Sequence, residues 1–179
     1  KVIRFLSFIG FPLSVILWYC AGDIILIIFG EQWVPSISVF QILSISVGVQ
    51  VVLSTSGSIF QAANDTRSLF ICGILSTTLN VSGILIGIFL FKTLEAIAWC
   101  ICITFTINFV QCYVWMYKVT FRCSMRPFWK QLLSPLLLSG IIGIVLFFIA
   151  SITKELSVFL ALIIKGGLFC IIFVLYIQL

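Results

Sequence analysis

The stretch SLFICGILSTTLNVSGILIGIFLF at residues 68–91 decides the fold, because it runs from Arg67 to Lys92 without one charged side chain. A helix rises about 1.5 Å per residue, so roughly 20 apolar residues cross the hydrocarbon core of a bilayer. This stretch is therefore long enough to cross a membrane once as a helix, with a basic residue at each end.

Further apolar runs of similar length follow one another along the chain, and short segments that carry the charges separate them. The expected spans are 5–29, 34–63, 68–91, 96–117, 132–152 and 156–179. The runs are unbroken and lack the alternating pattern of an outer-membrane β-barrel. We therefore predict an all-α, polytopic membrane protein, a helical bundle of about six transmembrane helices.

The composition excludes other classes of protein. Of the 179 residues, 63% are hydrophobic and 8% are charged, and the mean hydropathy is +1.33. These values exclude a soluble enzyme core, a disordered chain and a nucleic-acid-binding domain. Because the chain starts with Lys1, we expect that an N-terminal piece has been removed or that the sequence is internal. Trp18 and Tyr19 stand where signal-peptide cleavage needs small side chains, so the first span is not expected to be a signal peptide.

The basic residues predict the orientation in the membrane. Lys92 and Lys154 fall on one side of the six spans, whereas the N-terminus and the connections on the other side carry most of the basic residues. Since lysine and arginine gather on the cytoplasmic side, we expect both termini in the cytoplasm and the connections near 30–33, 92–95 and 153–155 outside. The residues on the expected cytoplasmic side are Lys1, Arg4, Arg67, Lys118, Arg122, Arg126 and Lys130.

The third span carries a stripe of small and polar residues on one helix face. Gly73, Ser76, Asn80, Gly83 and Gly87 repeat at steps of three and four, the spacing of one face of a helix. One interpretation is close helix packing through the spacing of Gly83 and Gly87. The other is the wall of a hydrated cavity, with Asn80 as its main hydrogen-bonding group. The two can hold at different depths.

The second and fourth spans carry similar stripes. Lipid penalises exposed amide and hydroxyl groups, so both helices are expected in the centre of the bundle or beside a water-filled path. The stripe residues are Ser46, Gln50, Ser54, Gly57 and Gln61 in the second span and Thr104, Asn108, Gln111 and Trp115 in the fourth.

Lys165 is the one basic residue expected deep within a span, roughly 14 Å from the start of the last helix by helical rise. It either reaches water by snorkelling or serves as a substrate or counter-charge group. An ammonium at the bilayer centre costs about 2.5–3.5 kcal/mol, so its replacement by leucine is expected to help insertion. The carboxylates fall near span ends or in connections, with Asp23 near the outer end of the first span, so no buried acid of a proton- or sodium-coupled carrier is expected.

Catalysis finds no support in the residues. The chain has no histidine, no phosphate-binding glycine loop and no cluster of acidic residues. The seven cysteines are typical of small membrane-buried residues. We therefore expect no catalytic residue, no metal, no cofactor and no enzymatic activity.

Three segments resemble a known family: DIILIIFGEQW at 23–33, VFQIL at 39–43 and IFQAANDTR at 59–67. They resemble the C-terminal half of bacterial polysaccharide (O-antigen type) flippases, of the superfamily shared by multidrug extruders (MATE-like) and lipid II flippases. In that family one helix ends in a Phe-Gly-x-x-Trp-like turn, and a later helix carries an asparagine, here Asn80. The resemblance covers about residues 1–130.

The resemblance implies two six-helix lobes around a central cavity, often followed by two extra helices. On this template, residues 1–130 are the last four helices of the C-terminal lobe and residues 131–179 are two additional C-terminal transmembrane helices. The N-terminal lobe, which is missing from this chain, is then an expected partner.

The implied function is translocation of a lipid-linked oligosaccharide across the bacterial inner membrane by alternating access, in polysaccharide or lipopolysaccharide biosynthesis. The expected partners are membrane lipid and a polyprenyl-diphosphate-linked oligosaccharide, with no nucleic acid. Sugars need amide and hydroxyl partners and a diphosphate needs cations. The candidate cavity residues are Gln50, Asn80, Asn108, Gln111 and Lys165, and the candidate cytoplasmic entrance residues are Arg67, Arg122 and Arg126.

Two alternatives stay open at this point. An ion-coupled multidrug or cation extruder of the same superfamily would need a membrane-embedded acid in the missing half, and the basic excess here argues against it. A membrane assembly subunit without cargo would be favoured if the polar stripes were helix–helix contacts without access to solvent.

Overall fold

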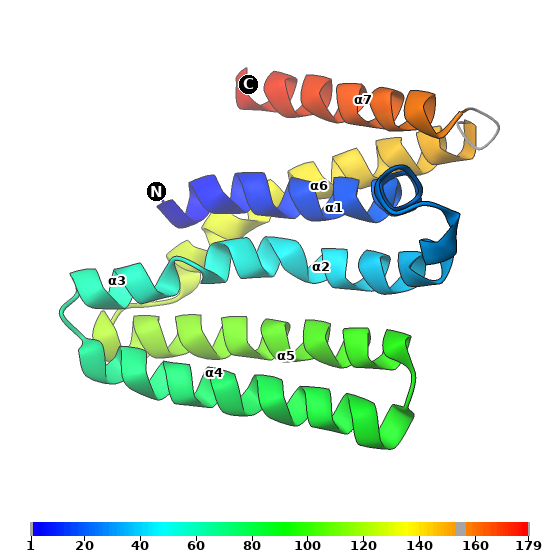
Figure 1. Ribbon diagram of the computed structural model, residues 1–179. Coiled ribbons are helices and arrows are strands. Elements are labelled where there is room, and N and C mark those ends of the chain that lie inside the picture. The colour runs from blue at the N-terminus through cyan, green and yellow to red at the C-terminus, as the bar shows by residue number, and fades with distance from the viewer. Residues whose placement is uncertain (1, 153–156, 179) are drawn as a thin grey trace.

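The computed structural model describes residues 2–152 and 157–178, which form helices and no strand (Figure 1). Lys1, Lys154 and the expected outer connection at 153–155 lie outside these residues. The α-helices are α1 (Val2–Ile28), α2 (Ile37–Leu53), α3 (Ser56–Ala62), α4 (Thr66–Ile86), α5 (Leu94–Trp115), α6 (Arg126–Ile152) and α7 (Val158–Gln178). A 3-10 helix, η1 (Glu31–Ser36), precedes α2, and the π-helical turns η2 (Gly87–Phe91) and η3 (Met116–Thr120) extend α4 and α5.

The described helices form six spans that are long and apolar enough to cross a membrane, as predicted. They run from Val2 to Ile28, Glu31 to Ala62, Thr66 to Phe91, Leu94 to Thr120, Arg126 to Ser151 and Val158 to Tyr176. The predicted all-α bundle is therefore confirmed. Most boundaries fall within three residues of the expected ones, because charged residues mark where an apolar run stops. The fifth span begins at Arg126, six residues before the expected start, because its helix includes Arg126 and Lys130.

The spans lie side by side in a row. Figure 1 shows α4 and α5 on one side, α2 and α1 in the middle, and α6 and α7 on the other side. Both described termini lie at one end of the row, together with the turn between α3 and α4 and the connection at 121–125. We call this the terminal end; η1 and the connection at 92–93 lie at the opposite end.

The second span is interrupted, although the sequence predicts a single helix over 34–63. Ser54 and Thr55 form a turn between α2 and α3. Their hydroxyls donate to the carbonyls of Val51 and Val52 at 2.8 and 2.9 Å, and the buried Tyr113 hydroxyl of α5 donates to the Val52 carbonyl at 2.9 Å. Hydroxyls that bond helix carbonyls compete with the helical pattern and bend helices, which accounts for the break.

Glycines set the closest helix crossings. Between α1 and α2, a Cβ added at Gly10 would lie 3.1 Å from the Gly48 carbonyl oxygen. Between α4 and α5, a Cβ at Gly83 would collide with the Thr104 side chain, and one at Gly87 would lie 3.0 Å from the Ile97 Cα atom. Small residues let helix backbones approach this closely in membranes. At these depths the small-residue stripe of α4 therefore packs against α5.

An aromatic cluster joins four helices at the terminal end. The Tyr113 ring of α5 stacks on the Phe128 ring of α6 with centroids 4.6 Å apart, and Phe109 lies beside both. Val52 of α2 and Phe60 of α3 are buried against the same cluster. This contact fixes the start of α6 beside the break in the second span.

The glycine contact gives a direct test of this packing. Gly83→Leu should lower the stability of the bundle by about 1–3 kcal/mol, because the new side chain overpacks the contact with Thr104. Gly73→Leu is the matched control, because no heavy atom lies within 4 Å of a Cβ at that position in the same helix. Thermal unfolding of the purified protein in detergent measures the difference. Equal melting temperatures for the two variants would contradict the packing of Gly83 against α5.

Candidate functional site

A buried ion pair joins the first and last helices. The Lys165 ammonium of α7 lies 2.6 Å from an Asp23 carboxylate oxygen of α1, with side chains 9% and 16% exposed. The ammonium also donates to the Tyr19 carbonyl oxygen at 3.3 Å. A buried charge is tolerated when a counter-charge and hydrogen bonds replace its water, and this arrangement supplies both.

The pair forms because the two residues lie at similar depths. Since α7 begins at Val158, Lys165 lies about 10 Å from the start of its helix, and Asp23 lies about 8 Å from the end of α1. The sequence places Lys165 deeper and Asp23 closer to the surface, which leaves the lysine without a partner in this chain. The structure shows that Asp23 is this partner. The expectation that leucine at position 165 helps insertion is therefore reversed, because the substitution would leave the buried Asp23 carboxylate without its counter-charge.

The four amide candidates lie on the other side of α1, away from Lys165. The Asn108 amide of α5 is 5% exposed and donates to the Ser76 hydroxyl of α4 at 2.7 Å. Gln50 donates to Ser46 within α2 at 2.8 Å, and Asn80 is half-buried. The Gln111 side-chain nitrogen is buried and has no hydrogen-bond partner among the described residues. Asn108 thus joins α5 to α4 by a hydrogen bond. Among the described residues, the four amides and Lys165 do not come together in a single site.

The cavity near these amides is small. It measures about 150 Å³ and lies between the second span, α4 and α5, where Ser56, Ser76, Asn108 and Cys112 line it. Liquid water takes about 30 Å³ per molecule, so a few waters fit. Sites for small organic ligands start at about 300 Å³. A cavity for a sugar chain would therefore need walls from outside the described residues.

The three entrance candidates lie exposed at the terminal end. Arg67 is the second residue of α4, Arg122 lies in the connection at 121–125, and Arg126 begins α6. Arg4, Lys118 and Lys130 are exposed at the same end. Arg122 has a φ of 51°, in the left-handed region, which marks the sharp turn that leads the chain into α6.

Asp65, the acidic residue described at this end, already accepts hydrogen bonds from the protein. The Asp65 carboxylate accepts hydrogen bonds from the Thr120 hydroxyl at 2.7 Å and the Ser68 backbone N–H at 3.0 Å. These bonds, with the Thr120 bond the strongest cause, hold the pKa of the Asp65 carboxyl below its usual range. Asp65 therefore stays ionised as the cap of α4 and links it to the end of α5.

Metal chemistry finds no site in the described part of the chain. No group of three or more cysteine, aspartate or glutamate side chains is close enough there to hold an ion.

Sequence reasoning missed the partners that these polar groups find. It singled out Lys165 and Asn108 but assigned them no contact within the chain, and it overlooked Ser14 of α1, whose hydroxyl accepts from the Gly48 N–H of α2 at 2.6 Å. The one available signal was that Asp23 and Lys165 are both counted from span ends expected on the same side of the membrane.

The ion pair predicts a pattern of double-variant stability. Asp23→Leu or Lys165→Leu alone should destabilise the protein by about 3–5 kcal/mol, because each leaves a buried charge unpaired. The Asp23→Leu, Lys165→Leu double variant should recover most of this loss. Thermal unfolding in detergent, with the yield of inserted protein, measures all three. Additive losses in the double variant would show that the two residues act independently.

Comparisons with known proteins agree with the resemblance found in the sequence. The family model for polysaccharide biosynthesis proteins matches residues 1–38. The teichuronic acid biosynthesis protein TuaB of Bacillus subtilis (strain 168) is 23% identical over 183 residues, which cover 96% of this chain and 36% of that protein. The chain thus spans about a third of the length of this curated relative. No solved structure matches the chain. The predicted resemblance to polysaccharide biosynthesis proteins is therefore confirmed, whereas membership of the MATE-like superfamily stays a prediction.

Proposed function

We propose that this chain is part of a transporter that moves a lipid-linked oligosaccharide from the cytoplasmic to the outer leaflet of the bacterial inner membrane by alternating access. The observation that carries the proposal is the separation of charge between the two ends of the bundle. Six exposed basic residues lie at the terminal end, where the described acidic residue is Asp65. At the opposite end, Lys92 is accompanied by Glu31 and Glu95.

The chemistry of the substrate fits the terminal end. A polyprenyl diphosphate carries its charge at the membrane surface, and guanidinium groups bind phosphate oxygens with paired hydrogen bonds. Arg67, Arg122 and Arg126 are exposed there, and Asp65 is occupied by Thr120 and Ser68. Arg67 lies close enough to Asp65 to help keep it ionised, but none of the three arginines forms an ion pair among the described residues. Their hydrogen-bond donors are thus available to an anion from the cytoplasm.

The family match and the relative support a role in polysaccharide biosynthesis. They also indicate that this chain corresponds to only part of such a protein. The family description names polysaccharide biosynthesis, and the name of TuaB names teichuronic acid biosynthesis. Since the chain spans about a third of that relative, we propose that the remaining walls of a substrate cavity come from a further lobe. The 150 Å³ cavity near Asn108 is consistent with this division.

The structure gives little support to the two alternative functions, an ion-coupled extruder and an assembly subunit without cargo. An ion-coupled extruder needs an embedded carboxylate that binds a cation, whereas Asp23 is neutralised by Lys165. An assembly subunit without cargo fits the interhelical bond of Asn108, but it gives no role to the basic residues at one end. Transport measurements separate these functions.

The orientation is tested by cysteine labelling from outside intact cells. In a background without native cysteines, Glu31→Cys should react with a membrane-impermeant thiol reagent and Ser124→Cys should not, because they lie exposed at opposite ends. Permeabilised cells provide the control, since both should then react. The reverse pattern would place the basic end outside and remove its proposed role.

The entrance is tested by removing its charge. The triple variant Arg67→Gln, Arg122→Gln, Arg126→Gln should lower the rate of lipid-linked oligosaccharide transport about tenfold or more, since each charged hydrogen bond contributes about 1.5–3 kcal/mol. Transport into proteoliposomes of the intact protein measures the rate. Lys92→Gln, at the opposite end, is the matched control and should transport normally. Equal rates for the triple variant and Lys92→Gln would refute the entrance, and no transport by the unmodified protein would refute the proposed function.

A further inference from the structure

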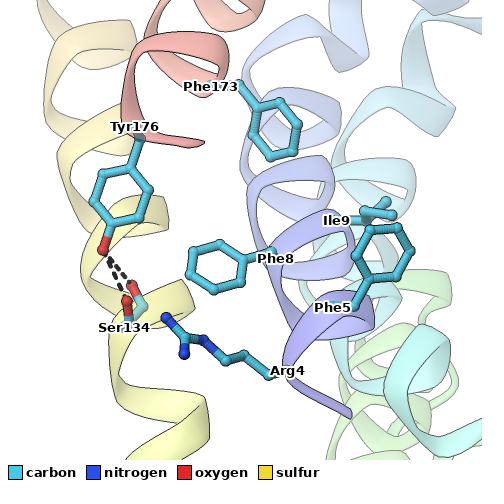
Figure 2. Close-up of a pocket in the computed structure, with 7 residues that line it drawn as sticks. All are labelled: Arg4, Phe5, Phe8, Ile9, Ser134, Phe173 and Tyr176. Atoms are coloured by element: carbon cyan, nitrogen blue, oxygen red, sulfur yellow. Dashed lines mark hydrogen bonds between the residues drawn. The ribbon is translucent and has the colours of Figure 1, made fainter. Parts of the chain in front are cut away.

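We propose that the cavity between α1, α6 and α7 binds an anionic membrane phospholipid, with its phosphate on Arg4 and an acyl chain along the aromatic wall. This site does not depend on the proposed transport function. The cavity measures about 710 Å³, within the range of pockets that hold drug-sized ligands. Its lining comes from the first turns of α1, from Ser134 of α6 and from Phe173 and Tyr176 of α7 (Figure 2).

One cation stands at the edge of this cavity. Figure 2 shows the Arg4 side chain directed from α1 toward Ser134 of α6, and its guanidinium carbon lies 5.5 Å from the centroid of the Phe8 ring. The ion pair found among the described residues is that of Lys165 with Asp23, so Arg4 has no carboxylate partner there. Its guanidinium keeps its hydrogen-bond donors for an anion.

The neighbouring hydroxyls do not compete for that anion. The Tyr176 and Ser134 hydroxyl oxygens lie 2.8 Å apart, and the Tyr176 hydroxyl lies 3.4 Å from the Ser134 carbonyl oxygen. Each hydroxyl therefore has a partner within the protein. Arg4 is left as the group that recognises charge, and it lies two residues into α1, at the start of the first span.

The rest of the cavity is apolar. Phe5, Phe8, Ile9 and Phe173 line it, and Phe5 is 65% exposed. A cation at the surface above an aromatic wall that faces the lipid matches a molecule with an anionic head and a hydrocarbon chain. Because such a chain comes from an equally apolar bilayer, its van der Waals packing against this wall, and not transfer from water, would hold it there.

The charge and the fixed geometry favour a resident phospholipid over the lipid-linked cargo. A single guanidinium balances the single charge of a phosphodiester, whereas a diphosphate is better matched by several cations. Two polar contacts also hold α7 in place on either side of the cavity: Tyr176 with Ser134 near its end, and Lys165 with Asp23 nearer its start. A cavity framed in this way suits a ligand that stays bound and fills the gap between three helices.

The test is lipid binding by the intact protein, purified in mild detergent and measured by native mass spectrometry. Phosphatidylglycerol, which is anionic, should bind one molecule per protein, and zwitterionic phosphatidylcholine should bind at least tenfold more weakly. Arg4→Gln should weaken phosphatidylglycerol binding about tenfold, and Arg4→Lys should keep part of it. Lys130→Gln, an exposed basic residue at the same end that does not line the cavity, is the control and should bind normally.

A second variant tests the place of the acyl chain. Ile9→Trp should fill part of the cavity and weaken phosphatidylglycerol binding, and its position at a lipid-facing surface lets the fold tolerate it. Binding that neither Arg4→Gln nor Ile9→Trp weakens would overturn the site. Displacement of phosphatidylglycerol by a polyprenyl diphosphate at equal concentration would overturn the choice of a resident phospholipid and assign the cavity to the cargo.

Discussion

The structure depends on one constraint: within a membrane, each buried polar group must find its partner inside the protein. Neighbouring helices satisfy this rule in turn, with the buried Gln111 amide nitrogen as an exception among the described residues. Lys165 of α7 meets Asp23 of α1, Ser14 of α1 meets the Gly48 N–H of α2, and Tyr113 of α5 meets the Val52 carbonyl of α2. Between α5 and α4, Asn108 meets Ser76. Apolar contact alone would let the helices slide or rotate, whereas these bonds fix their register.

The sequence predicts the elements well because each helix is a local property. An apolar run of sufficient length between charges, such as 68–91, identifies itself without its neighbours. The break between α2 and α3 is not a local property in this sense. The Val52 carbonyl accepts a hydrogen bond from Tyr113, which lies 61 residues further along the chain. The hydroxyl run from Ser54 to Ser56 signals a weak point in the helix, but the sequence does not show which distant group exploits it.

The candidate site could be predicted only as a list of residue types. Periodicity places Asn108 and Lys165 on helix faces, but it cannot tell which helices become neighbours. The arrangement in a row puts α1 and α2 between Lys165 and the amides of α5, so residues that share a chemistry do not share a location. The sequence places Asp23 near a span end, and its role as counter-charge follows only from the contact of α1 with α7.

The row of bonded helices has a consequence for any alternating-access movement. Polar bonds join α7 to α1, α1 to α2, α2 to α5 and α5 to α4, and Tyr176 joins α7 to α6 as well. A hinge inside the row would have to break at least one of them in a medium that offers no replacement partner, at a cost that rises steeply for the ion pair. The movement therefore costs least at the outer faces of the row, where apolar side chains slide past lipid or past another lobe. If the chain takes part in the proposed transport cycle, these bonds favour movement of the described helices as one body, with opening and closing along their border.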